Sequence, residues 1–381
     1  MDNLLVDGYN SNSGALTINN CDFGIYTHNI AAATQSVTMT NVGVGVYGEA
    51  NTFLKNLTVT NCEINAIRRG IQFTSNPGAG HIYISHNIVS TNDPEGVCIQ
   101  VEDAMLNQTT SLEILENPSI DCYAGLGGIW VTNFVASIIK WNYVNQFGFV
   151  QRDFSGILLT TCNQVEVSCN DVQGSGIDAS KASNGIRLDQ SGECIVHCNL
   201  VNQTNNGFVF NGACGSSDFA DNEIQNHETG LRLNNVAIIG NQFNQGNTWV
   251  GNYSSGFGAF NLGNSIGNVF EVHTPLSTLL LPQIFHPVNS GQGWFTINPL
   301  GDPYDCDNFD ECNPDPLNRM LNTNLSLEQS IADGTFTTLD YVPESKSIAK
   351  QYLYARLKRD IVLRNQNSSL QGFIRHNKIQ V

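Results

Sequence analysis

The sequence predicts an all-β solenoid of about ten rungs made of short parallel strands, and three observations point to it. A motif of apolar, any, any, Asn, any, apolar recurs along the chain, and a motif of Gly, apolar, any, apolar follows most copies. Successive glycines of the second motif are 21 to 32 residues apart, the length of one solenoid rung. With 41% hydrophobic and 13% charged residues among 381, the chain has enough apolar side chains for a packed core.

The asparagine of the first motif is expected at a bend between two strands. Asn tolerates left-handed backbone angles, and a stacked row of its amides can hydrogen-bond from one rung to the next. The six asparagines in this register are Asn87, Asn142, Asn170, Asn199, Asn222 and Asn241.

The glycine motif predicts a strand with one buried face. In Gly128-Ile129-Trp130-Val131, Ile129 and Val131 should point inward while Trp130 points outward, because successive residues of a strand face opposite sides. Strands this short cannot bury a face alone. We therefore expect equivalent strands of successive rungs to pair in parallel, about 4.8 Å apart, around a continuous core.

These two motifs resemble the repeat of the right-handed parallel β-helix found in pectate lyases, polygalacturonases, phage tailspikes and many secreted bacterial surface proteins. The resemblance covers residues 16–270 and implies a right-handed, single-stranded β-helix, although a fold does not by itself imply a function. The segment that includes Gly246-Asn247-Thr248-Trp249 and Gly293-Trp294-Phe295 is similar to the end of the β-helix in large secreted cargo of the type IX secretion route. That similarity implies an extracellular or cell-surface location.

We expect three parts: a parallel β-helix over residues 1–272, an irregular segment with Pro, Asp and Cys over 273–343, and a basic helical segment over 344–381. Residues 341–381 carry eight basic and two acidic residues, whereas the whole chain has a net charge of -17. Residues 345–364 have a helical apolar pattern without Gly or Pro. This helix either binds a partner or docks on its own acidic domain.

The composition and the chain ends limit the partners. With 34 acidic and 17 basic side chains, a nucleic-acid partner is not expected, because phosphates are bound by clustered Lys and Arg. No apolar run approaches the roughly 18 residues of a membrane span, so membrane insertion is not expected. The chain has no signal before Met1 and no sorting domain after Val381, so we expect it to belong to a longer protein, whose other domains or copies are its partners.

An outward column of the glycine-motif strands is the main candidate binding surface. The second residue after each glycine is large or apolar, whereas the next outward column is polar. One hypothesis is that surface glycans stack on Tyr26, Tyr47 and Trp130 and hydrogen-bond to Arg187 and Arg232. The alternative is that loops, the C-terminal helix or another domain cover this column. Its residues are Tyr26, Tyr47, Gln72, Cys98, Trp130, Leu158, Arg187, Val209 and Arg232.

The eleven cysteines offer two candidate disulfides. Cys169 and Cys198 occupy equivalent positions of adjacent rungs, and Cys306 and Cys312 flank a short loop. The alternative for the rung cysteines is a stack of buried free thiols.

The loop around Cys306 also carries a cluster of carboxylates. Closely spaced carboxylates suit a hard cation such as Ca²⁺, and the alternative is a solvated acidic turn. The candidate ligands are Asp302, Asp305, Asp307 and Asp310, next to Glu311. No other cofactor is expected.

These observations favour a non-catalytic module of a secreted or cell-surface bacterial protein, a rigid stalk or adhesive β-helix that binds glycans. The first alternative is a polysaccharide lyase or glycoside hydrolase that acts on acidic polysaccharide. Its family motifs Asn-x-Asp, Asp-Asp, Gly-His-Gly and Arg-x-Lys are absent as a set. Isolated catalytic candidates are Arg68, Arg69, His86, Glu102, Asp103 and His197. The second alternative is a structural spacer of a large surface fibre.

Overall fold

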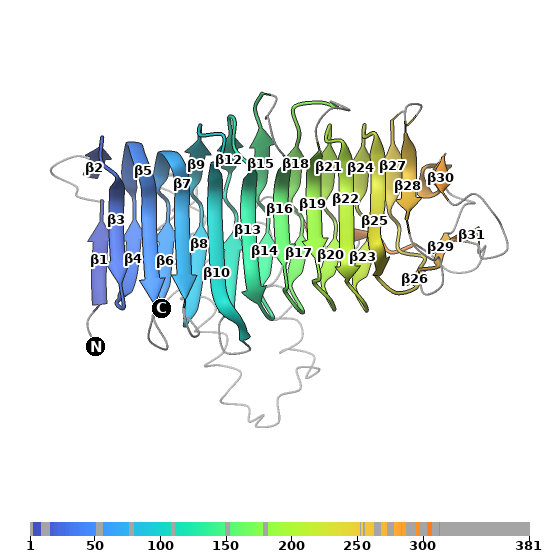
Figure 1. Ribbon diagram of the computed structural model, residues 1–381, viewed down its shortest axis with the longest axis horizontal. Coiled ribbons are helices and arrows are strands. Elements are labelled where there is room, and N and C mark those ends of the chain that lie inside the picture. Colours follow the sequence, from blue (N-terminus) through green and yellow to red (C-terminus); the bar gives the residue numbers. More distant parts are fainter. Residues whose placement is uncertain are drawn as a thin grey trace, which may run out of the picture. The chain divides into compact units, whose positions relative to one another are not determined.

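The computed structural model confirms an all-β parallel solenoid of about ten rungs (Figure 1). Each rung contributes one strand to each of three rows, and every pairing between rungs is parallel. The structure describes residues 3–8, 16–50, 56–75, 80–107, 111–148, 153–177, 182–251, 253, 256–262, 268–272, 278–282, 284–286, 294–297, 303–306 and 312.

Row 1 is a nine-stranded parallel sheet. Its strands are β1 (Asn3–Asp7), β4 (Ala31–Gln35), β6 (Leu57–Thr60), β8 (His81–Ser85), β11 (Ser111–Leu115), β14 (Ile138–Lys140), β17 (Glu166–Ser168), β20 (Ile195–His197) and β23 (Asp218–Ala220). Beyond it lies a short sheet of β26 (Gln242–Phe243), β29 (Phe270–Val272) and β31 (Phe295–Ile297).

Rows 2 and 3 belong to one larger sheet, because the long strands β5 (Val37–Ala50) and β7 (Glu63–Ser75) run through both. Row 2 contains β2 (Leu16–Asn19), β9 (Ile88–Thr91), β12 (Ser119–Cys122), β15 (Tyr143–Gln146), β18 (Asp171–Gln173), β21 (Leu200–Asn202), β24 (Glu223–Gln225) and β27 (Thr248–Val250). Row 3 contains β3 (Phe23–His28), β10 (Val97–Asn107), β13 (Gly127–Phe134), β16 (Phe154–Thr160), β19 (Ser183–Asp189), β22 (Asn206–Ala213), β25 (Thr229–Ile238), β28 (Phe257–Asn261) and β30 (Phe285–His286).

The core consists of apolar side chains that stack in register from rung to rung. Ile129 pairs with Ile99 on one side and with Ile157 on the other, and all three side chains are fully buried. Trp130, between two buried residues, is on the outer face, as the alternation predicts. Stacking like residues on like keeps the core continuous without any strand having to be hydrophobic on both faces.

The predicted asparagine ladder is present and fully buried at the bend between rows 1 and 2. From Asn87 to Asn222, each Nδ2 donates to Oδ1 of the asparagine in the next rung over 2.7–3.1 Å, and the backbone N–H of the same residue donates to that oxygen as well. The ladder residues are Asn87, Asn117, Asn142, Asn170, Asn199, Asn222 and Asn247.

The backbone at this bend differs from the expectation. The left-handed residue is the one before the asparagine, for example Cys169 (φ 54°) before Asn170 and Cys198 (φ 58°) before Asn199. The preceding residue makes the bend, and the asparagine side chain is then directed into the corner, where it reaches the next rung.

Two positions of the predicted ladder are also corrected. Asn241 is exposed and outside the ladder, which continues through Asn247 instead. Asn117 belongs to the ladder but was missed, because one extra residue places Ser119 where the motif has an apolar side chain.

Apart from the strands, the described chain contains one 3₁₀ turn, η1 (Thr278–Leu280), and no described helix is long and apolar enough to cross a membrane. Residues up to Asn308 form one compact unit. The predicted helix in 344–381 lies outside the described residues, as does the irregular segment from residue 313 onward.

Substitution of a central ladder residue should destabilise the protein strongly. In Asn170→Ala the side-chain bonds to Ile139 O, Ser168 O and Asn199 are lost, and the amide of Asn142 loses its acceptor. We expect the free energy of unfolding to fall by about 2–4 kcal/mol, because buried polar groups are left unsatisfied. Urea unfolding followed by circular dichroism measures this. Asn65→Ala, on an exposed position of β7, is the control and should change the value by less than about 0.5 kcal/mol. Equal effects of the two substitutions would contradict a stabilising role of the ladder.

Candidate functional site

The outer face of row 3 presents one side chain per rung in a straight column, which we call the outer column. The pairing register aligns Tyr26, Tyr47, Gln72, Gln100, Trp130, Leu158, Arg187, Val209, Arg232, Phe260 and His286. Successive members belong to adjacent parallel strands, so their backbones are about 4.8 Å apart.

One predicted member of the column is corrected. Cys98 is fully buried and Gln100 takes its place. The glycine motif at Gly96 is out of register, because Gly96 lies in a tight turn closed by its N–H bond to Asp93 O. Cys98 therefore occupies the bend position that Gly70 and Gly128 occupy in neighbouring rungs.

At one end of the column the structure brings Tyr26 and Tyr47 together with a third ring, Phe23. The ring centroids are 5.4–5.8 Å apart, and Tyr26 and Phe23 are 51% and 45% exposed. The phenol oxygens of Tyr26 and Tyr47 hydrogen-bond to Glu49 and Thr74 in the adjacent polar column. Phe23 escaped the sequence analysis because it precedes the glycine of its motif.

Trp130 lies three rungs beyond Tyr47, separated from it by Gln72 and Gln100. Its indole ring covers Gly127, where a Cβ atom would collide with the ring. The ring is half-buried, and its Nε1 has no hydrogen-bond partner among the described residues. A glycine at position 127 thus leaves free the space that the indole ring occupies.

The two arginines of the column are held by neighbouring polar residues. Arg187 makes two bonds of 2.8 Å to the carboxylate of Asp189, and Nε of Arg232 donates to Asn234 over 2.9 Å. Val209 between them is buried. The guanidinium of Arg232 also lies 5.6 Å from the ring centroid of Phe260, which begins a second aromatic group with Phe257 and His286.

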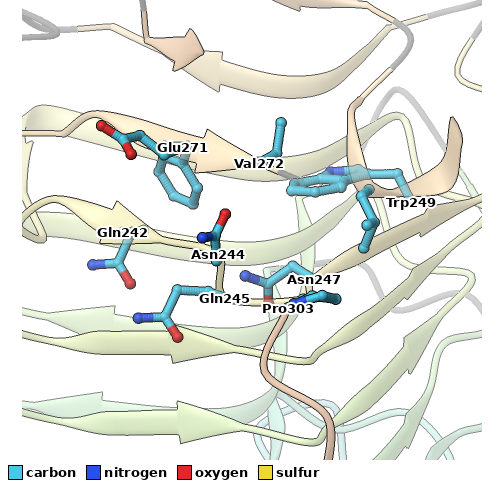
Figure 2. Close-up of a pocket in the computed structure, with 11 residues that line it drawn as sticks. Gln242, Asn244, Gln245, Asn247, Trp249, Glu271, Val272 and Pro303 are labelled. Atoms are coloured by element: carbon cyan, nitrogen blue, oxygen red, sulfur yellow. The ribbon is translucent and has the colours of Figure 1, made fainter. Parts of the chain in front are cut away.

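The outer column is therefore a linear array and not a converging pocket. A pocket found elsewhere in the described chain, between Gln242, Asn247 and Pro303, holds only about 10 Å³, room for one water molecule (Figure 2). A ligand of the outer column would have to be long and bind along several rungs.

Among the isolated catalytic candidates, Arg69 and Glu102 lie near the outer column. Arg69 Nε and Nη1 donate over 2.5 Å to Gln100 Oε1 and Glu95 O, and the amide of Gln100 donates to Glu102. Burial lowers the pKa of Arg69, while the charge of Glu102 opposes this effect. Asp103 is buried, and His86 is paired with Glu116 at the bend between rows 1 and 2, away from the outer column.

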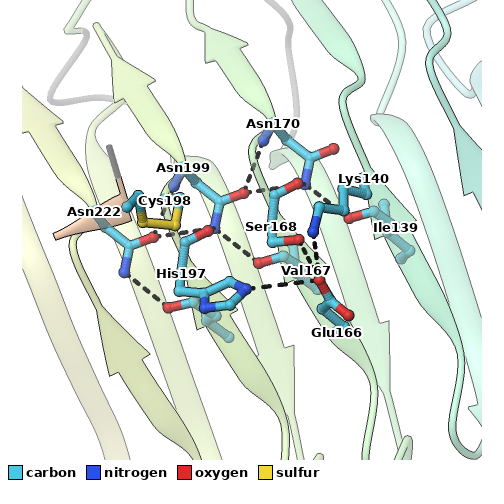
Figure 3. Close-up of polar contacts among 12 residues, drawn as sticks. Ile139, Lys140, Glu166, Val167, Ser168, Asn170, His197, Cys198, Asn199 and Asn222 are labelled. Atoms are coloured by element: carbon cyan, nitrogen blue, oxygen red, sulfur yellow. Dashed lines mark hydrogen bonds and ion pairs between the residues drawn. A yellow bond between two sulfur atoms is a disulfide. The ribbon is translucent and has the colours of Figure 1, made fainter. Parts of the chain in front are cut away.

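His197 belongs to a compact ionic cluster on row 1 (Figure 3). Glu166 Oε1 accepts from Ser168 over 2.6 Å and from Lys140 over 3.0 Å, and lies 3.6 Å from His197 Nε2. The bond with His197, aided by Ser168 and Lys140, lowers the pKa of Glu166 to about 2 against the effect of burial. Because Glu166 stays ionised and already accepts hydrogen bonds from Ser168 and Lys140, with His197 close by, the cluster resembles a structural network more than an acid and base pair.

The segment 303–306, here called the strap, runs along the bend next to this cluster. Tyr304 N donates to Asn244 O, Cys306 N donates to Asp221 Oδ2, and the Tyr304 ring stacks on His197. A disulfide joins Cys306 to Cys198, with Cα atoms 6.0 Å apart (Figure 3).

Because Cys198 is bonded to Cys306, neither candidate pairing is formed, not Cys169 with Cys198 and not Cys306 with Cys312. Cys198 stands at the left-handed bend position, where its side chain faces the strap and not the next rung. Cys169 and Cys312 are disulfide-bonded as well.

The alternative of buried free thiols holds for other rung cysteines. Cys162, Cys194 and Cys214 are free and buried, and burial raises the pKa of Cys162 to about 11 and that of Cys194 to about 12. Of the proposed calcium ligands only Asp305 is described, so calcium stays a prediction, while Asp302, Asp307 and Asp310 lie outside the described residues.

Comparison with known proteins gives no relative: no family model, curated protein or solved structure matches the chain. The similarity to type IX secretion cargo thus stays an expectation from the sequence.

The ionic cluster predicts a specific pH dependence of stability. In Glu166→Gln the charge-assisted bonds are lost, so at pH 7 we expect the free energy of unfolding to fall by about 1–3 kcal/mol. The folded-state pKa of Glu166, about 2, is below its ordinary value of 4.5, so its contribution is complete above pH 4.5 and lost toward pH 2. The difference between variant and wild type should shrink accordingly in urea titrations at pH 7 and pH 3. Glu63→Gln, on an exposed position of β7, is the control. A difference that is the same at both pH values would contradict the role of Glu166.

Proposed function

We propose that this chain is a rigid adhesive module of an extracellular or cell-surface protein, and that it binds a polysaccharide along the outer column. The observation that carries the proposal is the exposed aromatic cluster of Phe23, Tyr26 and Tyr47, in register with Trp130 on one continuous face. Exposed aromatic side chains gathered on one face are typical of interaction surfaces.

The spacing of the column favours a linear glycan. The rungs are about 4.8 Å apart, close to the length of one sugar residue in an extended chain, so each rung can contact one sugar unit. Aromatic rings offer apolar faces to sugar rings, while the amides of Gln72 and Gln100 can exchange hydrogen bonds with hydroxyl groups.

Charge favours a neutral glycan over an acidic one. Glu49 and Glu102 lie in the polar column beside the aromatic half, and Arg187 has its own counter-ion in Asp189. The chain as a whole has a net charge of -17, which would repel a polyanion.

The disulfide between Cys198 and Cys306 supports an extracellular location, because stable disulfides form mainly in oxidising compartments. The parallel β-solenoid supports the role of a stalk, because every rung pairs its backbone with the next.

The test is a glycan-array screen, followed by calorimetry with the best neutral oligosaccharide. The double substitution Tyr26→Ala and Tyr47→Ala should weaken binding about 30-fold, since each lost stacking contact costs on the order of 1 kcal/mol. Tyr123→Ala is the matched control, because Tyr123 is equally exposed at 51% but lies outside the outer column. If the control weakens binding as much as the double substitution, the outer column is not the binding face.

A second candidate function, polysaccharide lyase, is favoured by the position of Arg69, which is linked through Gln100 to Glu102 beside the outer column and whose burial lowers its pKa. An arginine can act as the base of a lyase only if it loses its proton. Unsaturated products from acidic polysaccharides, abolished by Arg69→Lys, would replace the adhesive proposal with this one. If the protein shows neither glycan binding nor turnover, the remaining candidate function is a structural spacer of a large surface fibre.

A further inference from the structure

We propose that Cys98 and Cys122 form an additional disulfide that cross-links two consecutive rungs when the protein matures in an oxidising compartment. Cys98 is in β10 of row 3, and Cys122 ends β12 of row 2 in the following rung. Their Sγ atoms are 3.1 Å apart, and both side chains are fully buried.

The contacts of the two thiols hold them in position to bond. Cys122 Sγ donates to Gly127 O over 3.1 Å, and Cys98 Sγ lies 3.5 Å from Asp121 O and 3.4 Å from Thr91 Oγ1. A disulfide is about 2.05 Å long, so the sulfurs need to approach by about 1 Å.

Among the described residues, the other buried free thiols have no such partner. Sγ of Cys62, Cys162, Cys194 and Cys214 each hydrogen-bonds to backbone carbonyl oxygens and not to another sulfur. The inference therefore applies to one pair among the free cysteines, and it provides an internal comparison.

The reaction is exchange with a low-molecular-weight disulfide such as oxidised glutathione. One cysteine thiolate attacks the reagent, which forms a mixed disulfide and releases one reduced thiol; the second cysteine thiolate then displaces the other half. The two protein thiols lose two protons and two electrons, and the reagent becomes two thiols.

The timing follows from burial. Within the folded rung the oxidant has no access, and burial raises the pKa of Cys122 well above its usual range, so the reactive thiolate is scarce. We therefore expect the bond to form while the chain folds and to be shielded from reductants afterwards.

The cross-link would brace the backbone beneath Trp130. Cys122 Sγ donates to the carbonyl oxygen of Gly127, and the indole ring of Trp130 covers this glycine on the outer face. This inference does not depend on glycan binding, since it concerns the covalent state of two side chains.

The test is oxidative refolding of the whole chain in a glutathione redox buffer, followed by alkylation in denaturant without reductant and peptide mapping by mass spectrometry. The structure has seven free thiols, and the proposal expects five of them to be alkylated, with one peptide pair linked through Cys98 and Cys122. The peptide pair linked through Cys198 and Cys306 is the positive control for oxidation.

The outcome that overturns the proposal is alkylation of both Cys98 and Cys122 in a sample where Cys198 and Cys306 are linked. Linkage of either residue to a different cysteine overturns it as well. The matched variants are Cys98→Ser, which should make Cys122 alkylatable, and Cys162→Ser, which should leave the linked pair intact. Because the mapping is also made on the wild type, a variant that fails to fold does not decide the result.

Discussion

The rest of the structure depends on one constraint, that the buried bend between rows 1 and 2 must satisfy its polar groups in every rung. The ladder from Asn87 to Asn247 does this with side-chain amides that bond to the next rung and to carbonyls of the previous one. Each amide serves both its neighbours, so the bend repeats in register. Fixed bends in turn place the apolar residues of every strand on the same inner columns, and the core follows from that alignment.

The same regularity creates the outer column. Because strand alternation is fixed by the inner residues, the side chain between two buried ones must point outward, and successive rungs bring these side chains into line. Tyr26 and Tyr47 meet for this reason although 21 residues separate them in sequence. A surface built in this way is long and repetitive, and it suits an extended polymer better than a compact ligand.

The strap and the ionic cluster show how irregular segments are attached to such a regular scaffold. The left-handed residue before each ladder asparagine directs its side chain away from the core, which makes this column available for attachment. Cys198 and Asp221 use it to hold the strap through a disulfide and a hydrogen bond. The proposed pair of Cys98 and Cys122 would instead tie rung to rung from inside.

The sequence by itself determined the solenoid, the inner columns and most of the ladder, because these depend on local alternation and on a repeat that is visible in the order of residues. It also found Tyr26, Tyr47 and Trp130, since strand alternation places them outside. Only the tertiary structure decided the register at Gly96, where loop length shifts Cys98 inward and brings Gln100 out. Only the tertiary structure paired Cys198 with Cys306, because that contact joins residues 108 positions apart and depends on the path of the strap, which no repeat encodes.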